Sequence, residues 1–187
     1  PLHFLAKYTV TVLPAFVSAK NTKLGSSVQV NLATAIDSSD KFPVLSDSAL
    51  LDSVQQRTFT YFWNFGHPVS GLARERNTSG DIVTTGGSGF GIMAILVGID
   101  RHFITRAEGL IRMAKIVNFL TRNVQTYHGA FPHWLNGATG ATIPFSTNDN
   151  GADLVETAYL MQGLLCARQF FNTADASEIM LRDQINT

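Results

Sequence analysis

Two kinds of helical segment alternate along the chain after residue 46, and this alternation limits the folds that the chain can adopt. Residues 47–65 and 105–124 carry apolar side chains at helical spacing on one side, whereas residues 89–99 and 153–171 are apolar nearly all round. A helix that is apolar on every side must be enclosed by others, and a one-sided helix covers a core from outside. The alternation predicts an all-α fold of helical hairpins in two concentric layers.

Several helix starts are marked by residues that cap free backbone N–H groups. Ser46 or Asp47 can begin the first helix, and Asp175 can begin a fifth one. Thr105 and Glu108 form the capping-box pattern at the start of the third helix. The sequence therefore predicts about five helices.

Two long loops, residues 66–87 and 127–150, precede the two enclosed helices. If neighbouring helices run antiparallel, both loops and the starts of both enclosed helices lie at the same end of the fold. Four unusual segments would then meet there: RER at 74–76, TTGGSGFGI at 84–92, PHW at 132–134 and DLVE at 153–156. We therefore expect a ligand site at this end.

Residues 1–45 differ from the helical part in composition. Residues 20–47 are rich in Ser, Thr, Asn and Asp, as in a linker, with one short strand near residues 28–32. Residues 8–19, YTVTVLPAFVSA, resemble a short signal peptide, but their T-V-T-V alternation fits an edge strand of a β module equally well. We predict that residues 1–45 are a linker or the remnant of an upstream β segment, and that residues 46–187 form the helical domain.

The glycine-rich segment matches no complete phosphate-binding or nucleophile motif. Gly86 and Gly91 have the spacing of a P-loop, but the lysine and the hydroxyl residue that should follow are missing. The G-x-S-x-G pattern fails at Phe90. Two interpretations stay open: a tight turn that packs two helices closely, or a turn at Gly87 and Ser88 whose backbone approaches a ligand.

Two acidic residues begin the second enclosed helix. Asp153 and Glu156 are three residues apart and share a helix face. An acid in the first turn commonly caps the helix, and for Asp153 capping and a catalytic role both stay open. Glu156 lies among apolar residues, where a carboxyl group can serve as a general acid.

The loops add candidates for ligand contact. Arg74, Glu75 and Arg76 follow one another in the first loop, and His133 and Trp134 are adjacent in the second. Isolated surface charges and a core tryptophan are the ordinary explanations. Their predicted convergence beside a carboxyl group favours binding instead, and aromatic faces commonly support sugar rings.

Several partners are not expected. Lys+Arg and Asp+Glu both number 14, so the chain has no basic excess for nucleic acid. No apolar run is long enough for a membrane span. The single Cys166, the absence of an H-E-x-x-H motif and an incomplete calcium-loop pattern around Gly151 indicate no metal site and no cofactor.

The segments named above also carry a resemblance to a known family. Residues 48–172 resemble the bacterial endo-β-1,2-glucanase glycoside hydrolases, whose domain is called glucoamylase-like. The segments that carry the resemblance are QRTFTYFWNFGHPVSGLARER, TTGGSGFGIMAILVGI, KIVNFL, GAFPHWLNGATG and NGADLVETAYLMQGLL, in that order along the chain. Residues 1–45 carry no such likeness.

The resemblance implies an (α/α)6 barrel and inverting, endo-type hydrolysis of β-1,2-glucan in its central pocket. By position it makes Glu156 and Asp153 the pocket carboxylates, and Arg74, Arg76, His133 and Trp134 contacts of a β-glucan oligosaccharide or polysaccharide. The same domain also occurs within cyclic β-1,2-glucan synthases, so a glucan-holding, non-catalytic role is the alternative. A bacterial, secreted enzyme of the periplasm or the extracellular space is the expected setting.

The barrel has six helical hairpins, whereas the chain has sequence for about five helices, so we expect it to form only the N-terminal portion. Inverting hydrolysis needs two carboxyl groups about 6.5–9.5 Å apart. Residues three apart on a helix can lie closer together, and we expect one partner to lie outside this chain. The isolated chain is therefore expected to be inactive or feeble, and its uncovered inner helices are expected to promote self-association.

Overall fold

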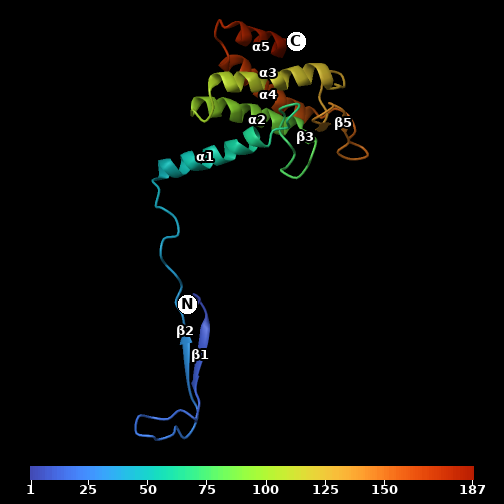
Figure 1. Ribbon diagram of the computed structural model, residues 1–187. Coiled ribbons are helices and arrows are strands. Elements are labelled where there is room, and N and C mark those ends of the chain that lie inside the picture. Colours follow the sequence, from blue (N-terminus) through green and yellow to red (C-terminus); the bar gives the residue numbers. More distant parts are fainter. The chain divides into compact units, whose positions relative to one another are not determined.

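The computed structural model describes all residues 1–187 (Figure 1). The chain divides into two compact units, residues Pro1–Ser46 and residues Asp47–Thr187. The first unit is a β-hairpin with irregular segments, and the second contains all five helices. The division lies at residue 46, where the composition of the sequence changes.

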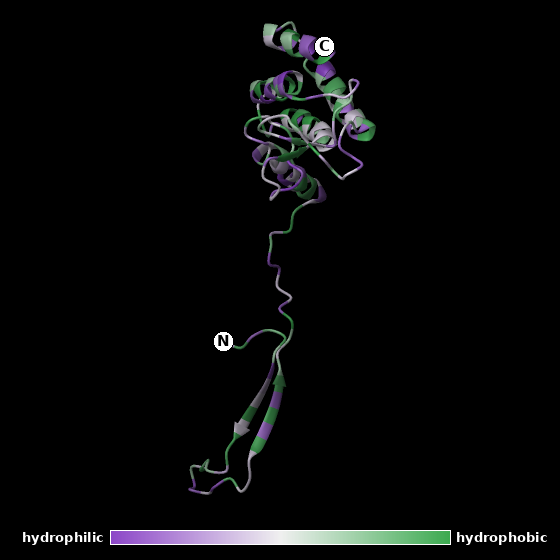
Figure 2. Cartoon of the chain, turned by 90° about the vertical axis from the view of Figure 1, so that its right-hand side faces the viewer, coloured by the Kyte–Doolittle hydropathy of each residue, from purple (hydrophilic) through white to green (hydrophobic).

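The first unit is built on two antiparallel strands, β1 (Lys7–Val12) and β2 (Val28–Ala33). The register pairs Tyr8 with Leu32, Val10 with Val30, and Val12 with Val28. Successive side chains of a strand point to opposite faces. Figure 2 shows the resulting alternation of hydrophobic and hydrophilic residues along β2.

The second unit consists of five helices and three short strands. The helices are α1 (Asp47–Asn64), α2 (Thr85–Asp100), α3 (Arg106–Asn123), α4 (Leu154–Phe170) and α5 (Ala176–Asn186). The strands β3 (Ile82–Thr84), β4 (Trp134–Asn136) and β5 (Thr142–Ile143) form one antiparallel sheet in that order. Helix α2 packs against α1, α3 and α4, and α5 packs against α3 and α4. The predicted capping box is present, since Thr105 and Glu108 bond reciprocally at the start of α3.

The glycine-rich segment forms the first turns of α2, and the prediction of a turn ahead of the helix is wrong. The reason lies in its packing against α4. A Cβ atom on Gly89 would lie 2.1 Å from the carbonyl oxygen of Tyr159, and one on Gly163 would lie 2.5 Å from the carbonyl oxygen of Gly89. The glycines let the two helix backbones approach each other. The interpretation as close packing of two helices is therefore confirmed, although the segment is helical.

Helix α1 is covered at only one end. Phe59 is buried against Gly98 of α2, whereas Leu51 and Val54, expected to face a core, are more than half exposed. The expected amphipathic contact along all of α1 is therefore wrong for this chain. The N-terminal half of α1 has apolar residues at helical spacing but no neighbouring element to receive them.

Helices α2 and α4 are enclosed on one side only. Their mutual contact and α3 bury Ile92, Ile95 and Leu160. Phe90 and Val97 of α2 and Tyr159 of α4 remain between 43% and 56% exposed. In residues 1–187, each of the two helices therefore has one covered face and one uncovered apolar face.

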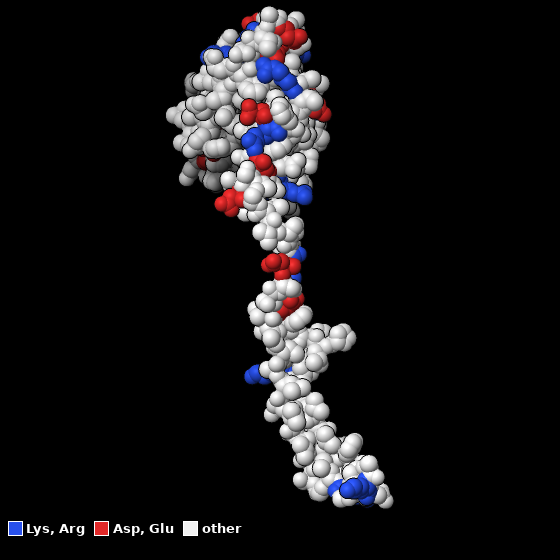
Figure 3. Space-filling view, turned by 90° about the vertical axis from the view of Figure 1, so that its left-hand side faces the viewer, with Lys and Arg blue, Asp and Glu red and all other residues white.

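The helical unit presents no strongly charged surface on the face that Figure 3 shows. Positive and negative side chains lie close to one another there, among uncharged atoms. None of the helices is both long and apolar enough to cross a membrane.

Candidate active site

Backbone hydrogen bonds bring the four unusual segments together at one end of the helical unit. The Thr84 N–H donates to the Ala73 carbonyl, the Thr85 N–H to the His133 carbonyl and the Asp153 N–H to the Phe131 carbonyl. Each bond joins segments that are far apart in sequence. The β3–β4–β5 sheet thus ties the starts of α2 and α4 to the loop that precedes β3, as the expected convergence requires (Figure 1).

Asp153 is the N-cap of α4. One carboxylate oxygen accepts hydrogen bonds from the N–H groups of Val155 (2.9 Å) and Glu156 (3.0 Å), and the other lies 2.9 Å from Nδ1 of His133. Burial raises the pKa of Asp153, but the hydrogen bonds from the Glu156 amide, His133 and the Val155 amide lower it more, so that it lies below its usual value. Asp153 is therefore an ionised acceptor that fixes the helix start and His133.

Glu156 links the starts of α4 and α2. Its Oε2 accepts a 2.7 Å hydrogen bond from the N–H of Gly86. A Cβ atom on Gly86 would lie 2.7 Å from the same oxygen, so only glycine leaves room for the carboxylate at this place. The other oxygen, Oε1, has no protein partner, and the side chain is half-buried. Glu156 thus keeps one oxygen free for a ligand.

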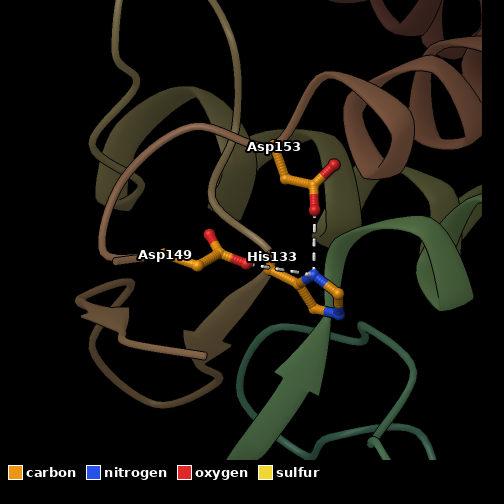
Figure 4. Close-up of side chains that lie close together, drawn as sticks. All are labelled: His133, Asp149 and Asp153. Atoms are coloured by element: carbon orange, nitrogen blue, oxygen red, sulfur yellow. Dashed lines mark hydrogen bonds and ion pairs between the residues drawn. The ribbon is translucent and has the colours of Figure 1, made fainter. Parts of the chain in front are cut away.

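His133 lies between two carboxylates. Its Nδ1 is 2.9 Å from Oδ2 of Asp153 and 3.9 Å from Oδ2 of Asp149, with the carboxylates reaching it from the start of α4 and from the loop before it (Figure 4). The Asp153 contact has hydrogen-bond length, and the Asp149 contact is an ion pair when the imidazole is protonated. The arrangement fixes the plane of the imidazole ring.

Two aromatic rings, those of Phe145 and Trp134, adjoin the imidazole of His133. The ring of Phe145 stacks on His133 at a centroid distance of 4.2 Å, and it meets the edge of Trp134 at 4.8 Å. Phe145 is 49% exposed. The predicted aromatic platform at Trp134 therefore includes a second, more exposed ring from the 144–149 loop.

The residues of RER occupy the same end but are bound to their own loop. The guanidinium of Arg74 donates to the carbonyls of Gly80 (2.8 Å) and Phe65 (3.2 Å). Arg76 pairs with the adjacent Glu75, and this hydrogen bond lowers the pKa of the Glu75 carboxyl. Arg76 is exposed, so its charge can reach a ligand, whereas Arg74 stabilises the loop.

Gly87 and Ser88 lie in the first turn of α2. The Ser88 hydroxyl is buried, donates to the Thr84 carbonyl at 2.6 Å and accepts from the Ala73 N–H at 3.0 Å. Both bonds hold the loop to the helix start, and the buried hydroxyl faces no solvent. Gly87 is half-buried, beside the side chain of Thr84.

One cluster has the residue types of a metal site. His133, Asp149 and Asp153 offer ligand atoms that all lie within 4.8 Å of one another. A cation bound by all three would replace the hydrogen bond between His133 and Asp153, because Nδ1 cannot both donate that proton and coordinate a metal. The expectation of no metal stays a prediction.

Sequence reasoning missed Asp149 and Phe145 as members of this site. A signal existed for Asp149, which lies in Asn148-Asp149-Asn150-Gly151, four residues before the helix cap. Phe145 has no local signal, because its contacts with His133 and Trp134 arise from the β4–β5 hairpin.

Comparison with known proteins places the chain beside enzymes that act on β-1,2-glucan. An exo β-1,2-glucooligosaccharide sophorohydrolase of Parabacteroides distasonis is 50% identical over 145 residues, or 76% of this chain and 20% of the relative. No family model matches the chain. The resemblance to β-1,2-glucan hydrolases stated from the sequence is thus confirmed.

Solved structures agree. The endo-β-1,2-glucanase of Chitinophaga pinensis, in complex with sophorotriose and glucose, is 47% identical with a TM-score of 0.73, covering 76% of this chain and 36% of the relative. A β-1,2-glucanase of Parabacteroides distasonis is 43% identical with a TM-score of 0.74, covering 96% of this chain and 24% of the relative. The chain therefore spans between a fifth and two fifths of the length of these relatives.

Proposed function

We propose that this chain is part of a glycoside hydrolase that cleaves β-1,2-glucosidic bonds of glucan. The observation that carries the proposal is 50% identity with a sophorohydrolase over 145 residues, together with the convergence of the four segments at one end of the helical unit. The starts of α2 and α4 hold a carboxyl group with a free oxygen at the same end of the helical unit as the aromatic rings of Trp134 and Phe145. This is suitable chemistry for an uncharged sugar substrate.

In this proposal Glu156 is the acid that protonates the leaving glycosidic oxygen. Glycoside hydrolysis by inversion needs a second carboxylate as base, about 6.5–9.5 Å away, which activates a water molecule. Asp153 is bonded through both oxygens and has a lowered pKa, so it supports the site by holding His133 and the start of α4. The base is then Asp149 or a carboxylate of the complete protein that lies outside residues 1–187.

We propose that the helical unit is the first part of an (α/α)6 barrel. The uncovered apolar faces of α2 and α4 are what such a barrel would enclose with further helices. In the isolated chain these faces are free to associate, so self-association is a prediction that sedimentation velocity can test. Secretion to the periplasm or beyond also stays a prediction.

The test uses the complete protein that carries this chain and linear β-1,2-glucan. We expect short oligosaccharides and new reducing ends from the unmodified protein, and a loss of more than about 1000-fold in kcat for Glu156→Gln, because a glutamine cannot donate the proton. Glu108→Gln is the matched control, since Glu108 stands at the same helical position of α3, is exposed, and a capping box accepts glutamine.

Three outcomes separate the alternatives. Oligosaccharides of mixed length support the predicted endo cleavage, and release of sophorose alone indicates exo cleavage, as in the name of the Parabacteroides relative. Saturable oligosaccharide binding without new reducing ends would support the non-catalytic, glucan-holding module or synthase domain. Normal turnover by Glu156→Gln would refute the role of Glu156.

A further inference from the structure

The hairpin of the first unit has one face that is apolar except for the hydroxyl group of Tyr8. In the β1–β2 register, Tyr8, Val10 and Val12 of β1 stand directly opposite Leu32, Val30 and Val28 of β2. Paired residues of an antiparallel ladder lie on the same face, so all six side chains share one face. The opposite face carries Thr and Asn side chains that bond to each other, Thr9 to Asn31 at 2.7 Å.

Within residues 1–46, no other strand or helix covers this apolar face. Val10, Val28, Val30 and Leu32 are each between 45% and 50% exposed. An isolated two-stranded hairpin is at best marginally stable in water, because two strands bury too little apolar area to offset the loss of chain entropy. A face of this kind is normally the inner face of a larger β structure.

The comparisons indicate that the hairpin has a counterpart in a longer protein. The helical unit, residues 47–187, makes up about three quarters of the chain. A match that covers 96% of the chain must therefore extend through most of residues 1–46, whereas a match that covers 76% need not. The relative matched over 96% is also much the longer of the two, since the match fills only 24% of it against 36%.

We propose that the apolar face of β1 and β2 is covered by a second antiparallel β-sheet of the same polypeptide, so that the hairpin is one edge of a β-sandwich. Sheets of a sandwich pack face to face about 10 Å apart, with alternate side chains of each strand in the shared core. The side chains of Val10 and Val30 would be central in that core. The face of Thr9 and Asn31 is the outer, solvated one.

The experiment measures the accessibility of each face in the complete protein that carries this chain. In a Cys166→Ser background, Val30→Cys probes the apolar face, and Gln29→Cys, the neighbouring residue on the opposite face, is the matched control. We expect maleimide to label Cys at position 30 at least about 100-fold more slowly than Cys at position 29. Unfolding in guanidinium should equalise the two rates, and circular dichroism checks that both variants fold.

The same measurement separates the other ways of covering the face. The proposal requires protection that is independent of protein concentration in the complete protein and absent from residues 1–187 alone. Protection that grows with concentration would mean that a second copy covers the face. Equal labelling of both positions, or full protection within residues 1–187, would also overturn the proposal.

Discussion

The first turns of α4 and α5 have the same local sequence, D-x-x-E, and different surroundings. Asp153 and Asp175 each accept hydrogen bonds from the backbone N–H groups two and three residues further on. Glu156 and Glu178 then stand at the same helical position. The local sequence determines the cap in both helices, but it does not determine what the glutamate binds.

Glu178 stabilises the fold. It is buried and accepts hydrogen bonds from Arg106 at 2.6 and 3.1 Å and from the Thr173 N–H at 2.9 Å. The Arg106 guanidinium holds the pKa of Glu178 down at about 2, although burial opposes this. The pair joins the start of α3 to the start of α5.

Glu156 has a different set of neighbours. Its single protein partner is the N–H of Gly86, and Oε1 is free. A carboxylate saturated by a guanidinium stabilises the fold, whereas one with a free oxygen is available to a ligand. The two helix starts differ in one respect: Glu178 has a cationic partner far away in the sequence, and Glu156 has none. This partner determines whether the glutamate stabilises the fold or stays available to a ligand.

The largest expected effect on stability comes from removing the guanidinium of the Arg106–Glu178 ion pair. Arg106→Met keeps an unbranched apolar side chain but removes the guanidinium, which lies over the rings of Phe170 and Phe171, and it leaves the buried Glu178 without its charged partner. We expect the free energy of unfolding to fall by about 3 kcal/mol. Urea denaturation monitored by circular dichroism measures it.

A matched control for this variant is Arg101→Met. Arg101 forms an ion pair with Asp52, in which both side chains are exposed. We expect a loss below about 1 kcal/mol, because solvent screens exposed pairs. Equal losses for the two variants would contradict the distinction between a structural acid at α5 and ordinary surface charges.

A substitution at Gly86 tests whether the position of the Glu156 carboxylate matters to the reaction. A methyl group there would lie 2.7 Å from Oε2 of Glu156, at the mobile end of a side chain that can move away. We expect Gly86→Ala to change the free energy of unfolding by less than about 1 kcal/mol, since alanine favours the helix. The displaced carboxylate should lower kcat on β-1,2-glucan in the complete protein by about 10- to 100-fold.

Gly151→Ala is the control for Gly86→Ala, because no atom lies within 4 Å of the added methyl group. Gly151 precedes α4, the helix that carries Glu156, and Gly151→Ala should leave kcat within about twofold of the unmodified protein. If Gly86→Ala leaves kcat equally unchanged, the position of Glu156 does not matter to the reaction. The proposal for Glu156 would then lose its geometric basis.

Lowering the pH should weaken the ion pair between Arg106 and Glu178 over a defined range. A carboxyl group whose pKa is lower in the folded than in the unfolded chain stabilises the fold above the unfolded pKa, near 4.5, and this contribution falls as pH drops toward 2. Between pH 7 and pH 3 we expect a loss of about 2 kcal/mol from Glu178 alone. The measurement compares urea denaturation of the unmodified protein and Glu178→Gln at both pH values, and identical pH dependence would contradict it.

Sequence reasoning predicted the parts of the molecule that depend on local pattern. The helix starts at Asp47, Thr105 and Asp175 and the strand pattern at residues 9–12 follow from capping and periodicity, and the structure has them. The helical start of the glycine-rich segment was missed, because glycine disfavours helices locally. Only the close contact of Gly89 with Gly163 across two helices explains it.

The candidate site was predictable in its location but not in its bonding. Antiparallel connection of the helices was enough to place DLVE, PHW and the glycine-rich segment at one end. The pairing of Asp153 with His133, the self-contained bonds of Arg74 and the role of Phe145 depend on distances across the sheet. No periodicity in the sequence encodes such distances.

The smallest expected effect on the free energy of unfolding comes from substituting the two helix caps, Asp153 and Asp175. Asparagine caps a helix as well as aspartate does, so Asp175→Asn should change the free energy of unfolding by no more than about 0.5 kcal/mol. Asp153→Asn keeps the cap but removes the charged partner of His133, and a hydrogen bond to a carboxylate is stronger than one between neutral groups. We therefore expect Asp153→Asn to lower the free energy of unfolding by about 1 kcal/mol. Paired denaturation curves measure the difference, and because the two caps are alike in geometry, a difference near zero would mean that the His133–Asp153 bond contributes nothing to stability.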